Sequence, residues 1–360
     1  MVAGAAVFYA GQWLLNNRSQ ISIGGSSKAQ IGDSLISRFN EVIEKNPGNP
    51  DFIRLANDEA LSPVISSDGK NILYLVPKKG EVRILSIDNY AGGSRVIAKI
   101  PVGAQSVSWS KKDGGLIVHY TNYSEYIDTT TGKSKKYDSQ IINPVFSPGG
   151  DEIAYIFFND KESAGDIAVA DPLLKNYSNI INTRSDQWRL VWADENTLSL
   201  ILKVPKSNDM HSLYLLDINT KKLSLQLDSL EGLSILWSQK GDKYIYPAIE
   251  NGVTHLVMAN LASGKTRGIS APIDVNRCAW SIDDKTIYCS IPSEFSGSWS
   301  GKFIMIDTES GSSKTLDSTS DLTYNANNID ADEIILTILE DALIFRNIND
   351  GKLYKINIRP

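Results

Sequence analysis

Residues 64–74 read Val64-Ile65-Ser66-Ser67-Asp68-Gly69-Lys70-Asn71-Ile72-Leu73-Tyr74. Two short apolar runs flank a polar turn. Asp68 offers a side chain that bonds to backbone amides, and Gly69 accepts the positive φ that a tight bend requires. The stretch therefore predicts a strand that ends at Ile65 and a second strand that starts near Asn71.

The same pattern returns down the chain, and one apolar or aromatic residue marks the end of the first strand in most copies. These anchor residues are Ile65, Trp109, Phe146, Trp192, Trp237, Trp280 and, in a degenerate copy, Asn327. Subtraction of their numbers gives spacings of 44, 37, 46, 45, 43 and 47 residues. A period of about 40–45 residues that holds four short strands is typical of a β-propeller blade.

A second turn, running from Asp or Asn towards Gly or Lys, predicts a hairpin between the third and fourth strands. Its copies are 128–133, 217–221, 260–265, 307–311 and 347–352. The two turns predict an all-β, seven-bladed propeller over residues 51–360, with blades near 62–105, 106–142, 143–186, 187–232, 233–274, 275–321 and 322–360. A six-bladed ring would require the short second repeat to form something else. The strand Phe52–Leu55 can pair beside Leu353–Ile358, which would close the ring.

The tryptophans at anchor positions are expected to pack between sheets rather than to bind a ligand, because Ile65 and Phe146 fill the same position. Cys278 and Cys289 are equidistant from the turn near Asp283, so they should face each other across one hairpin. A disulfide and two buried thiols both fit this placement.

The sequence of the N-terminal segment predicts a membrane tether. Residues 1–18 begin with an apolar run to Leu15, too short for a full membrane span, and are interpreted as part of a truncated membrane anchor. Residues 19–50 hold a Gly/Ser-rich linker and an amphipathic helix over 32–45. The propeller would then lie outside the cytoplasm, in the periplasm or at the cell surface.

Catalytic and metal-binding patterns are weak. The three histidines, His119, His211 and His255, fall at different points of their repeats, which argues against a metal site. No Gly-x-Ser-x-Gly elbow precedes a helix, so no catalytic residue and no cofactor are predicted. The net charge of −6 without a basic stripe argues against a nucleic-acid partner.

Binding is predicted on the longer loops that join second to third strands, 159–165, 204–211 and 292–302. The expected binding residues are Trp188, Met210, His211, Phe295 and Trp299. An alternative for Phe295 and Trp299 is that they fold back and cover a blade edge.

The turn sequences resemble those of TolB-type, WD-like propeller repeats of bacterial envelope proteins, which read Ser-Pro-Asp-Gly-Lys-x-Ile-Ala-Tyr. Residues 66–74 and 147–155 match this pattern closely. The resemblance implies an extracytoplasmic protein that works by contact, although the α/β domain that precedes the TolB propeller has no counterpart here. The sequence thus favours a membrane-tethered, non-catalytic module that binds a protein or glycan through one propeller face. The alternatives are a polysaccharide lyase or hydrolase with a site at the channel mouth, and a structural subunit of an envelope assembly.

Overall fold

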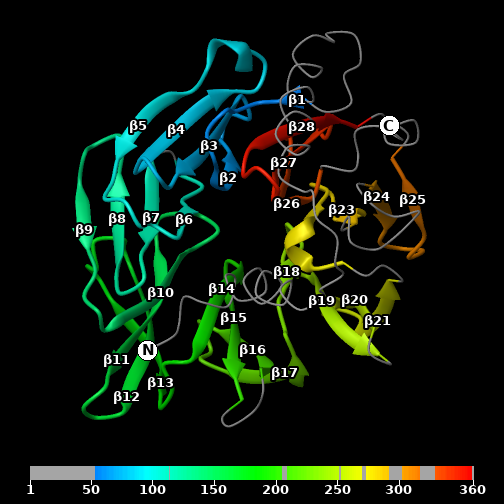
Figure 1. Cartoon of the computed structure of the whole chain (residues 1–360). Helices are drawn as coiled ribbons and strands as arrows, with labels where there is room; N and C mark the ends of the chain where they lie inside the picture. Colours follow the sequence, from blue (N-terminus) through cyan, green and yellow to red (C-terminus); the bar gives the residue numbers. More distant parts are fainter. Residues whose placement is uncertain are drawn as a thin grey trace, which may run out of the picture. The chain divides into compact units, whose positions relative to one another are not determined.

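The computed structural model describes residues 53–112, 114–204, 209–250, 253–269, 273–291, 302–316 and 329–358. These residues belong to one compact unit, Phe52–Pro360. They form seven antiparallel four-stranded sheets that follow one another around a ring (Figure 1). The predicted all-β, seven-bladed propeller is confirmed, and the short second repeat is a complete blade.

Each blade has an innermost first strand and an outermost fourth strand, and first strands of several successive blades contact one another. The first strands are β2 (Leu61–Ile65), β6 (Ser106–Trp109), β10 (Ile141–Phe146), β14 (Trp188–Asp194), β18 (Leu236–Trp237), β22 (Cys278–Trp280) and β26 (Ala331–Leu336). The second strands are β3 (Asn71–Val76), β7 (Gly115–His119), β11 (Ile153–Asn159), β15 (Thr197–Lys203), β19 (Lys243–Glu250), β23 (Thr286–Ile291) and β27 (Ala342–Asn347). The third strands are β4 (Glu81–Ser86), β8 (Ser124–Asp128), β12 (Ala164–Ala170), β16 (Met210–Asp217), β20 (Val253–Asn260), β24 (Lys302–Asp307) and β28 (Leu353–Asn357). The fourth strands are β5 (Arg95–Lys99), β9 (Ser134–Lys136), β13 (Ser178–Thr183), β17 (Leu223–Glu231), β21 (Lys265–Ile269), β25 (Ser313–Thr315) and β1 (Ile53–Arg54), and two short 3-10 turns are η2 (Tyr90–Gly92) and η3 (Val275–Arg277).

The ring is closed by its first strand. Ile53 of β1 pairs with Lys355 of β28, and Leu55 N donates to Leu353 O at 2.8 Å. The N-terminal strand is therefore the fourth strand of blade seven, and Leu353–Asn357 is the third. This pairing covers the outer edge that blade seven would otherwise expose.

The seventh anchor was predicted at the wrong residue. In six blades the residue after the anchor donates its N–H to the carbonyl five residues later, and in blade seven this is Thr337 N to Ala342 O at 3.0 Å. The seventh anchor is thus Leu336 and not Asn327. The prediction missed it because Glu340 takes the positive φ of 52° that glycine often supplies elsewhere.

The turn over 347–352 was also misplaced, since it joins the second and third strands of blade seven rather than the third and fourth. An Asn-to-Gly turn suits any tight hairpin, so its sequence does not reveal which pair of strands it connects.

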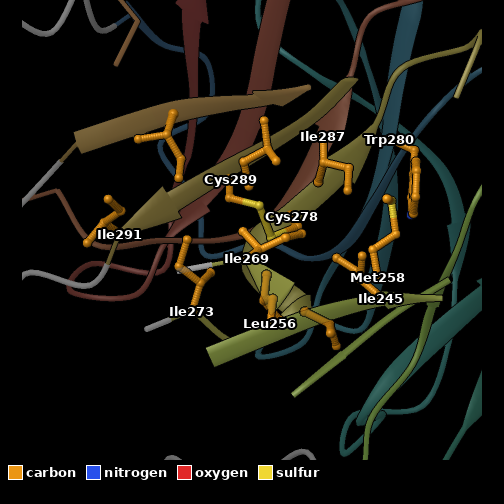
Figure 2. Packing of buried hydrophobic residues seen from close by; sticks show 13 residues of the cluster. Ile245, Leu256, Met258, Ile269, Ile273, Cys278, Trp280, Ile287, Cys289 and Ile291 are labelled. Carbon is orange, nitrogen blue, oxygen red and sulfur yellow. A yellow bond between two sulfur atoms is a disulfide. The ribbon is translucent and has the colours of Figure 1, made fainter. Parts of the chain in front are cut away.

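Buried side chains between neighbouring sheets form the core. The cluster between blades five and six contains Ile245 and Leu256 from one sheet and Ile287 from the next (Figure 2). Cys278 and Cys289 lie in this cluster, are register partners as predicted, and form a disulfide. The disulfide therefore links the first two strands of blade six inside an apolar core.

The anchor tryptophans pack between blades, which confirms their structural role. Trp192, Trp237 and Trp280 are buried, and Trp109 is partly buried. Trp109 Nε1 donates to Ser62 O of the preceding blade at 2.7 Å.

The expected membrane anchor, linker and helix over residues 1–50 lie outside the described residues. Within the residues that are described, no helix is long and apolar enough to cross a membrane.

Truncation of an anchor tests the packing. Trp237→Ala should lower the free energy of unfolding by about 3–5 kcal/mol, because it removes a large buried ring. Leu339→Ala is the control, since Leu339 is 80% exposed. Urea denaturation measures both variants. A loss below about 1 kcal/mol for Trp237→Ala would contradict the blade packing described here.

Candidate functional site

One face of the propeller carries the loops between second and third strands together with the connections between blades. Backbone hydrogen bonds tie the two sets together, such as Ile100 N to Gly80 O at 2.8 Å and Gly232 N to Asp209 O at 3.1 Å. We call this the loop face. It is the face on which the sequence predicts binding.

Polar side chains join neighbouring blades at the loop face, at the position three residues before each anchor. We call it the seam position, and it is filled by Ser62, Ser106, Asn143, Arg189, Ser234, Arg277 and Glu333. Side chains that donate reach a carbonyl at the start of the next blade. Asn143 Nδ2 donates to Trp188 O at 2.7 Å, and Arg277 Nη1 donates to Ala331 O at 3.0 Å.

Other seam side chains act as acceptors and receive a hydrogen bond from a backbone N–H of the next blade. Ser62 Oγ accepts from Val107 N at 3.1 Å. Glu333 Oε2 accepts from Ser62 N at 2.8 Å, and this bond joins blade seven to blade one. Five of the seven seam positions thus bond to the following blade, counting Arg189, which is described below.

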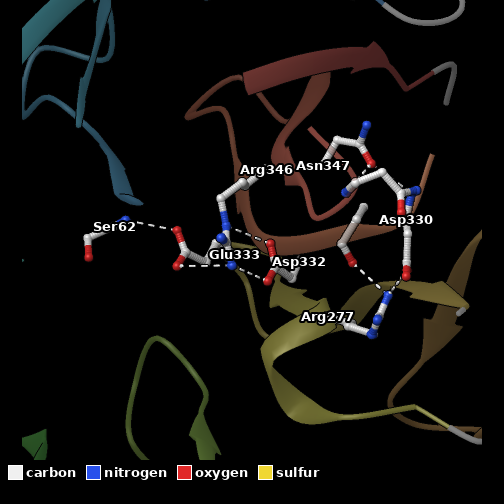
Figure 3. A network of polar contacts seen from close by, with 9 residues as sticks. Ser62, Arg277, Asp330, Asp332, Glu333, Arg346 and Asn347 are labelled. Atoms are coloured by element: carbon white, nitrogen blue, oxygen red, sulfur yellow. Dashed lines mark hydrogen bonds and ion pairs between the residues drawn. The ribbon is translucent and has the colours of Figure 1, made fainter. Parts of the chain in front are cut away.

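Blades six and seven carry a charged network on the loop face (Figure 3). Arg277 forms an ion pair with Asp330, and Arg346 Nε donates to Asp332 Oδ1 at 3.0 Å. Burial raises the pKa of Asp332 and raises that of Glu333 to about 7. Glu333 Oε1 lies 3.8 Å from Arg346 Nη2. These carboxyl groups therefore have arginine neighbours within the fold.

Arg189 fills the seam position of blade four. Its Nη2 donates to Leu233 O of blade five at 2.5 Å. Its Nε is buried and has no hydrogen-bond partner in the part of the chain that the structure describes. Arg189 thus differs from Arg277, which has a carboxylate partner as well as a carbonyl.

His211 lies on the same side of blade four as Arg189. Arg189 pairs with Ile201, and Ile201 pairs with Leu213, so Arg189 and Leu213 lie on the same side of the sheet. His211 lies two residues before Leu213 in the same strand and therefore shares this side. His211 Nδ1 lies 2.9 Å from Asp209 O, a carbonyl that can only accept, so Nδ1 carries the proton and Nε2 is an acceptor. Burial, and then the charge of Arg189, lowers the pKa of His211. A neutral imidazole therefore lies in the field of a guanidinium.

Trp188 and Met210, which were also predicted to bind, are not part of the pair formed by Arg189 and His211. Trp188 is 7% exposed and donates from Nε1 to Thr183 Oγ1 at 2.8 Å. It belongs to the interface between blades three and four, not to the exposed rim, because strand alternation turns it away from Arg189. Met210 is partly buried at the start of β16. Phe295 and Trp299 lie outside the described residues and stay predictions.

His119 occupies a polar cluster in blade two. Its Nε2 lies 2.8 Å from Ser108 Oγ, and its Nδ1 lies 3.1 Å from Ser124 Oγ. Burial lowers the pKa of His119 to about 4. An imidazole with so low a pKa is a weak base, so this contact does not activate Ser108 as a nucleophile.

A groove of about 410 Å³ lies on blade three beside the predicted loop Asn159–Gly165. Phe157, Asp166 and Asn182 lie in one row across three strands. Phe157 is 39% exposed, and Asn182 Nδ2 donates to Asp166 Oδ1 at 2.6 Å. A Cβ on Gly165 would lie 2.1 Å from Phe157 O, so only glycine allows the groove wall to form as it does.

The sequence had identified the loop but not the residues in the groove. Phe157, Asp166 and Asn182 are spaced along three strands, and only the register brings them together. Arg189 could have been found from the repeat, because Arg277 also lies three residues before a tryptophan anchor. Among the described residues, no group of three or more His, Cys, Asp or Glu side chains is placed to hold a metal ion.

No protein-family model and no curated protein matches the sequence. Solved structures share its fold. An oligogalacturonate lyase in complex with manganese aligns with a TM-score of 0.64 and 11% identity, over 87% of this chain and 94% of that chain. The oligogalacturonate lyase of Vibrio parahaemolyticus gives 0.63 and 12%, over 86% and 93%. The hydrazine synthase of Kuenenia stuttgartiensis gives 0.57 and 13%, over 84% and 97%. At these identities the likeness shows the β-propeller fold alone, and the TolB-type family stays a prediction.

The depressed pKa of His119 predicts a pH dependence. Because the folded pKa of His119 is depressed to about 4, the unfolded chain binds a proton that the folded chain does not. The stability that this group contributes is present above pH ~6.5 and is lost as the pH falls towards ~4. His119→Gln should therefore flatten the fall in unfolding free energy over this range.

Urea denaturation between pH 7 and 4 measures this effect, and His255→Gln is the matched control. An unchanged pH slope in His119→Gln would show that the histidine is protonated as easily in the folded chain as in the unfolded one.

Proposed function

We propose that this chain is a non-catalytic binding module that holds a glycan in the blade-three groove. The row of Phe157, Asp166 and Asn182 carries the proposal, because it sets an exposed aromatic ring beside two planar polar groups. A sugar presents apolar C–H faces and a rim of hydroxyls. An aromatic ring covers the first, and carboxylate and amide groups bond to the second.

The shape and polarity of the groove favour a glycan over a protein partner. Its volume of about 410 Å³ lies within the range of small-ligand sites. Glu162 and Arg184 also line it, so its wall combines charged groups with the Phe157 ring. A protein interface would instead be expected to bury an extended apolar patch.

We also propose a location outside the cytoplasm, with a membrane tether. The apolar run to Leu15 supports the tether, and the disulfide between Cys278 and Cys289 supports an oxidising compartment.

A second candidate function is a polysaccharide lyase or hydrolase with its site on the loop face. Glu333 favours this candidate, since a carboxyl group with a pKa of about 7 suits general acid–base catalysis. Against it, Glu333 already accepts a hydrogen bond from Ser62 N and lies close to Arg346. Release of reducing ends from polygalacturonate, abolished by Glu333→Gln, would favour the enzyme.

Removal of the aromatic ring tests the glycan proposal. Phe157→Ala should weaken binding to the best ligand of an oligosaccharide array about tenfold or more, a loss of about 1.4 kcal/mol or more. The melting temperature should hardly change, because the ring is already 39% exposed. Isothermal titration calorimetry with the full chain measures the affinity.

Leu225→Ala is the matched control, since Leu225 is an exposed apolar residue on β17, away from the groove. Wild-type protein that binds no oligosaccharide on the array, or a Phe157→Ala variant with wild-type affinity, would contradict the proposal.

A further inference from the structure

Arg189 and Arg277 occupy equivalent places in two blades, and the difference between their surroundings points to a binding site. Each lies three residues before a tryptophan anchor, and each donates to a buried carbonyl that begins the next blade. For Arg277 this carbonyl belongs to Ala331, which is fully buried, and for Arg189 it belongs to Leu233, which is 1% exposed. Both guanidinium groups therefore reach across to a buried carbonyl near the start of the next blade.

The residue before the accepting carbonyl differs. Asp330 precedes Ala331 and supplies the carboxylate that pairs with Arg277. Gly232 precedes Leu233 and has no side chain. A Cβ built on Gly232 would meet no atom of the described residues within 4 Å, so these residues leave space where a carboxylate-bearing side chain would start. Within the part of the chain that the structure describes, Arg189 thus has the carbonyl partner of this arrangement without the carboxylate partner.

The remaining groups around Arg189 leave it positive. Its Nε–H is buried without a partner among the described residues. Asp209 interacts with it only through charge, no ion pair within 4.0 Å joins them among the described residues, and the Asp209 side chain is 64% exposed. Lys203 adds positive charge near His211. An isolated, half-buried guanidinium of this kind binds carboxylates well, because it offers two parallel N–H donors.

We propose that Arg189 binds the carboxylate of a ligand, in the role that Asp330 plays for Arg277. The acceptor Nε2 of His211 on the same side of the blade favours a ligand with a hydroxyl donor near its carboxylate. A sugar acid, such as a uronic acid unit, has this arrangement. The choice of a sugar acid over a protein carboxylate rests on the proposed glycan-binding function, whereas the carboxylate site itself does not.

The Nε–H signal of Arg189 in a ¹⁵N-edited NMR spectrum of the full chain tests the proposal directly. Arg189→Lys identifies the signal by its loss. Addition of D-galacturonate should shift it, while the methyl ester of the same sugar should not, because the ester has no charge. The signal of Arg277 is the internal control and should stay in place, since Asp330 already occupies its partner position.

Gly232→Asp provides the decisive variant. Its new carboxylate should occupy the site, so the Arg189 signal should move without ligand and should no longer respond to galacturonate. Aspartate tolerates the positive φ of 60° at this position better than most residues. Gly232→Ala carries a similar backbone strain without the charge and should respond like wild type.

A third variant does not depend on position 232. Asp209→Asn removes the carboxylate whose charge acts on Arg189 and should enlarge the response to galacturonate. If no carboxylate shifts the Arg189 signal in either wild type or Asp209→Asn, the site does not exist.

Two further probes separate this inference from the glycan proposal. The first probe is an acetylated dipeptide with a free C-terminal carboxylate. If it shifts the Arg189 signal at a lower concentration than galacturonate does, the choice of a sugar acid is wrong and the site binds a protein carboxylate. The second probe is a neutral oligosaccharide. If it binds through Phe157 while the Arg189 signal does not respond to galacturonate, the carboxylate site is contradicted and the proposed function stands.

Discussion

The propeller depends on the bonds that run from one innermost strand to the next at the seam position. An innermost strand pairs with a second strand on one side only, so its other edge exposes backbone groups towards the centre of the ring. Several of these groups lie on buried residues, such as the carbonyls of Leu233 and Ala331. Seam side chains satisfy them from the preceding blade, and an unsatisfied buried carbonyl would otherwise cost free energy.

The seam also explains why polar and charged residues gather on the loop face. A seam residue needs a polar side chain that can donate to or accept from the next blade, and the residue chosen sets the local charge. Ser62 and Asn143 are neutral, whereas Glu333 and Arg277 require compensating partners, which Arg346 and Asp330 supply. Arg189 is the member of this set for which the described residues hold no carboxylate partner within ion-pair distance. In this view a structural position becomes a binding position when its internal partner is absent.

The sequence predicted the fold better than it predicted the site, for physical reasons. Turns such as Ser66–Lys70 are local, so their residues reveal strand ends without any knowledge of packing. Leu336 escaped detection because Glu340 takes the conformation that glycine usually signals. His211 was predicted as a binding residue from its loop, and it lies on the same side of blade four as Arg189. Trp188 is the neighbour of Arg189 in sequence, yet strand alternation turns it to the opposite side of the blade.

The residues of the blade-three groove were likewise not predicted from the sequence. Its loop, Asn159–Gly165, was predicted from its length, but Phe157, Asp166 and Asn182 meet only through the register of three strands. Register depends on hydrogen-bonded pairing over the whole blade, and a single sequence does not display it.

The central claim is that the two seam arginines differ because, among the described residues, Arg277 has an internal carboxylate partner and Arg189 does not. The most direct measurement compares the stability loss of Arg277→Ala with that of Arg189→Ala by urea denaturation at neutral pH. Arg277→Ala should cost more, about 2–3 kcal/mol, because it removes the hydrogen bond to Ala331 O and leaves the partly buried Asp330 without its counter-charge. Arg189→Ala should cost about 1 kcal/mol, the value of one hydrogen bond to a carbonyl. Equal losses would contradict the account, because they would mean that the fold supports Arg189 as fully as it supports Arg277.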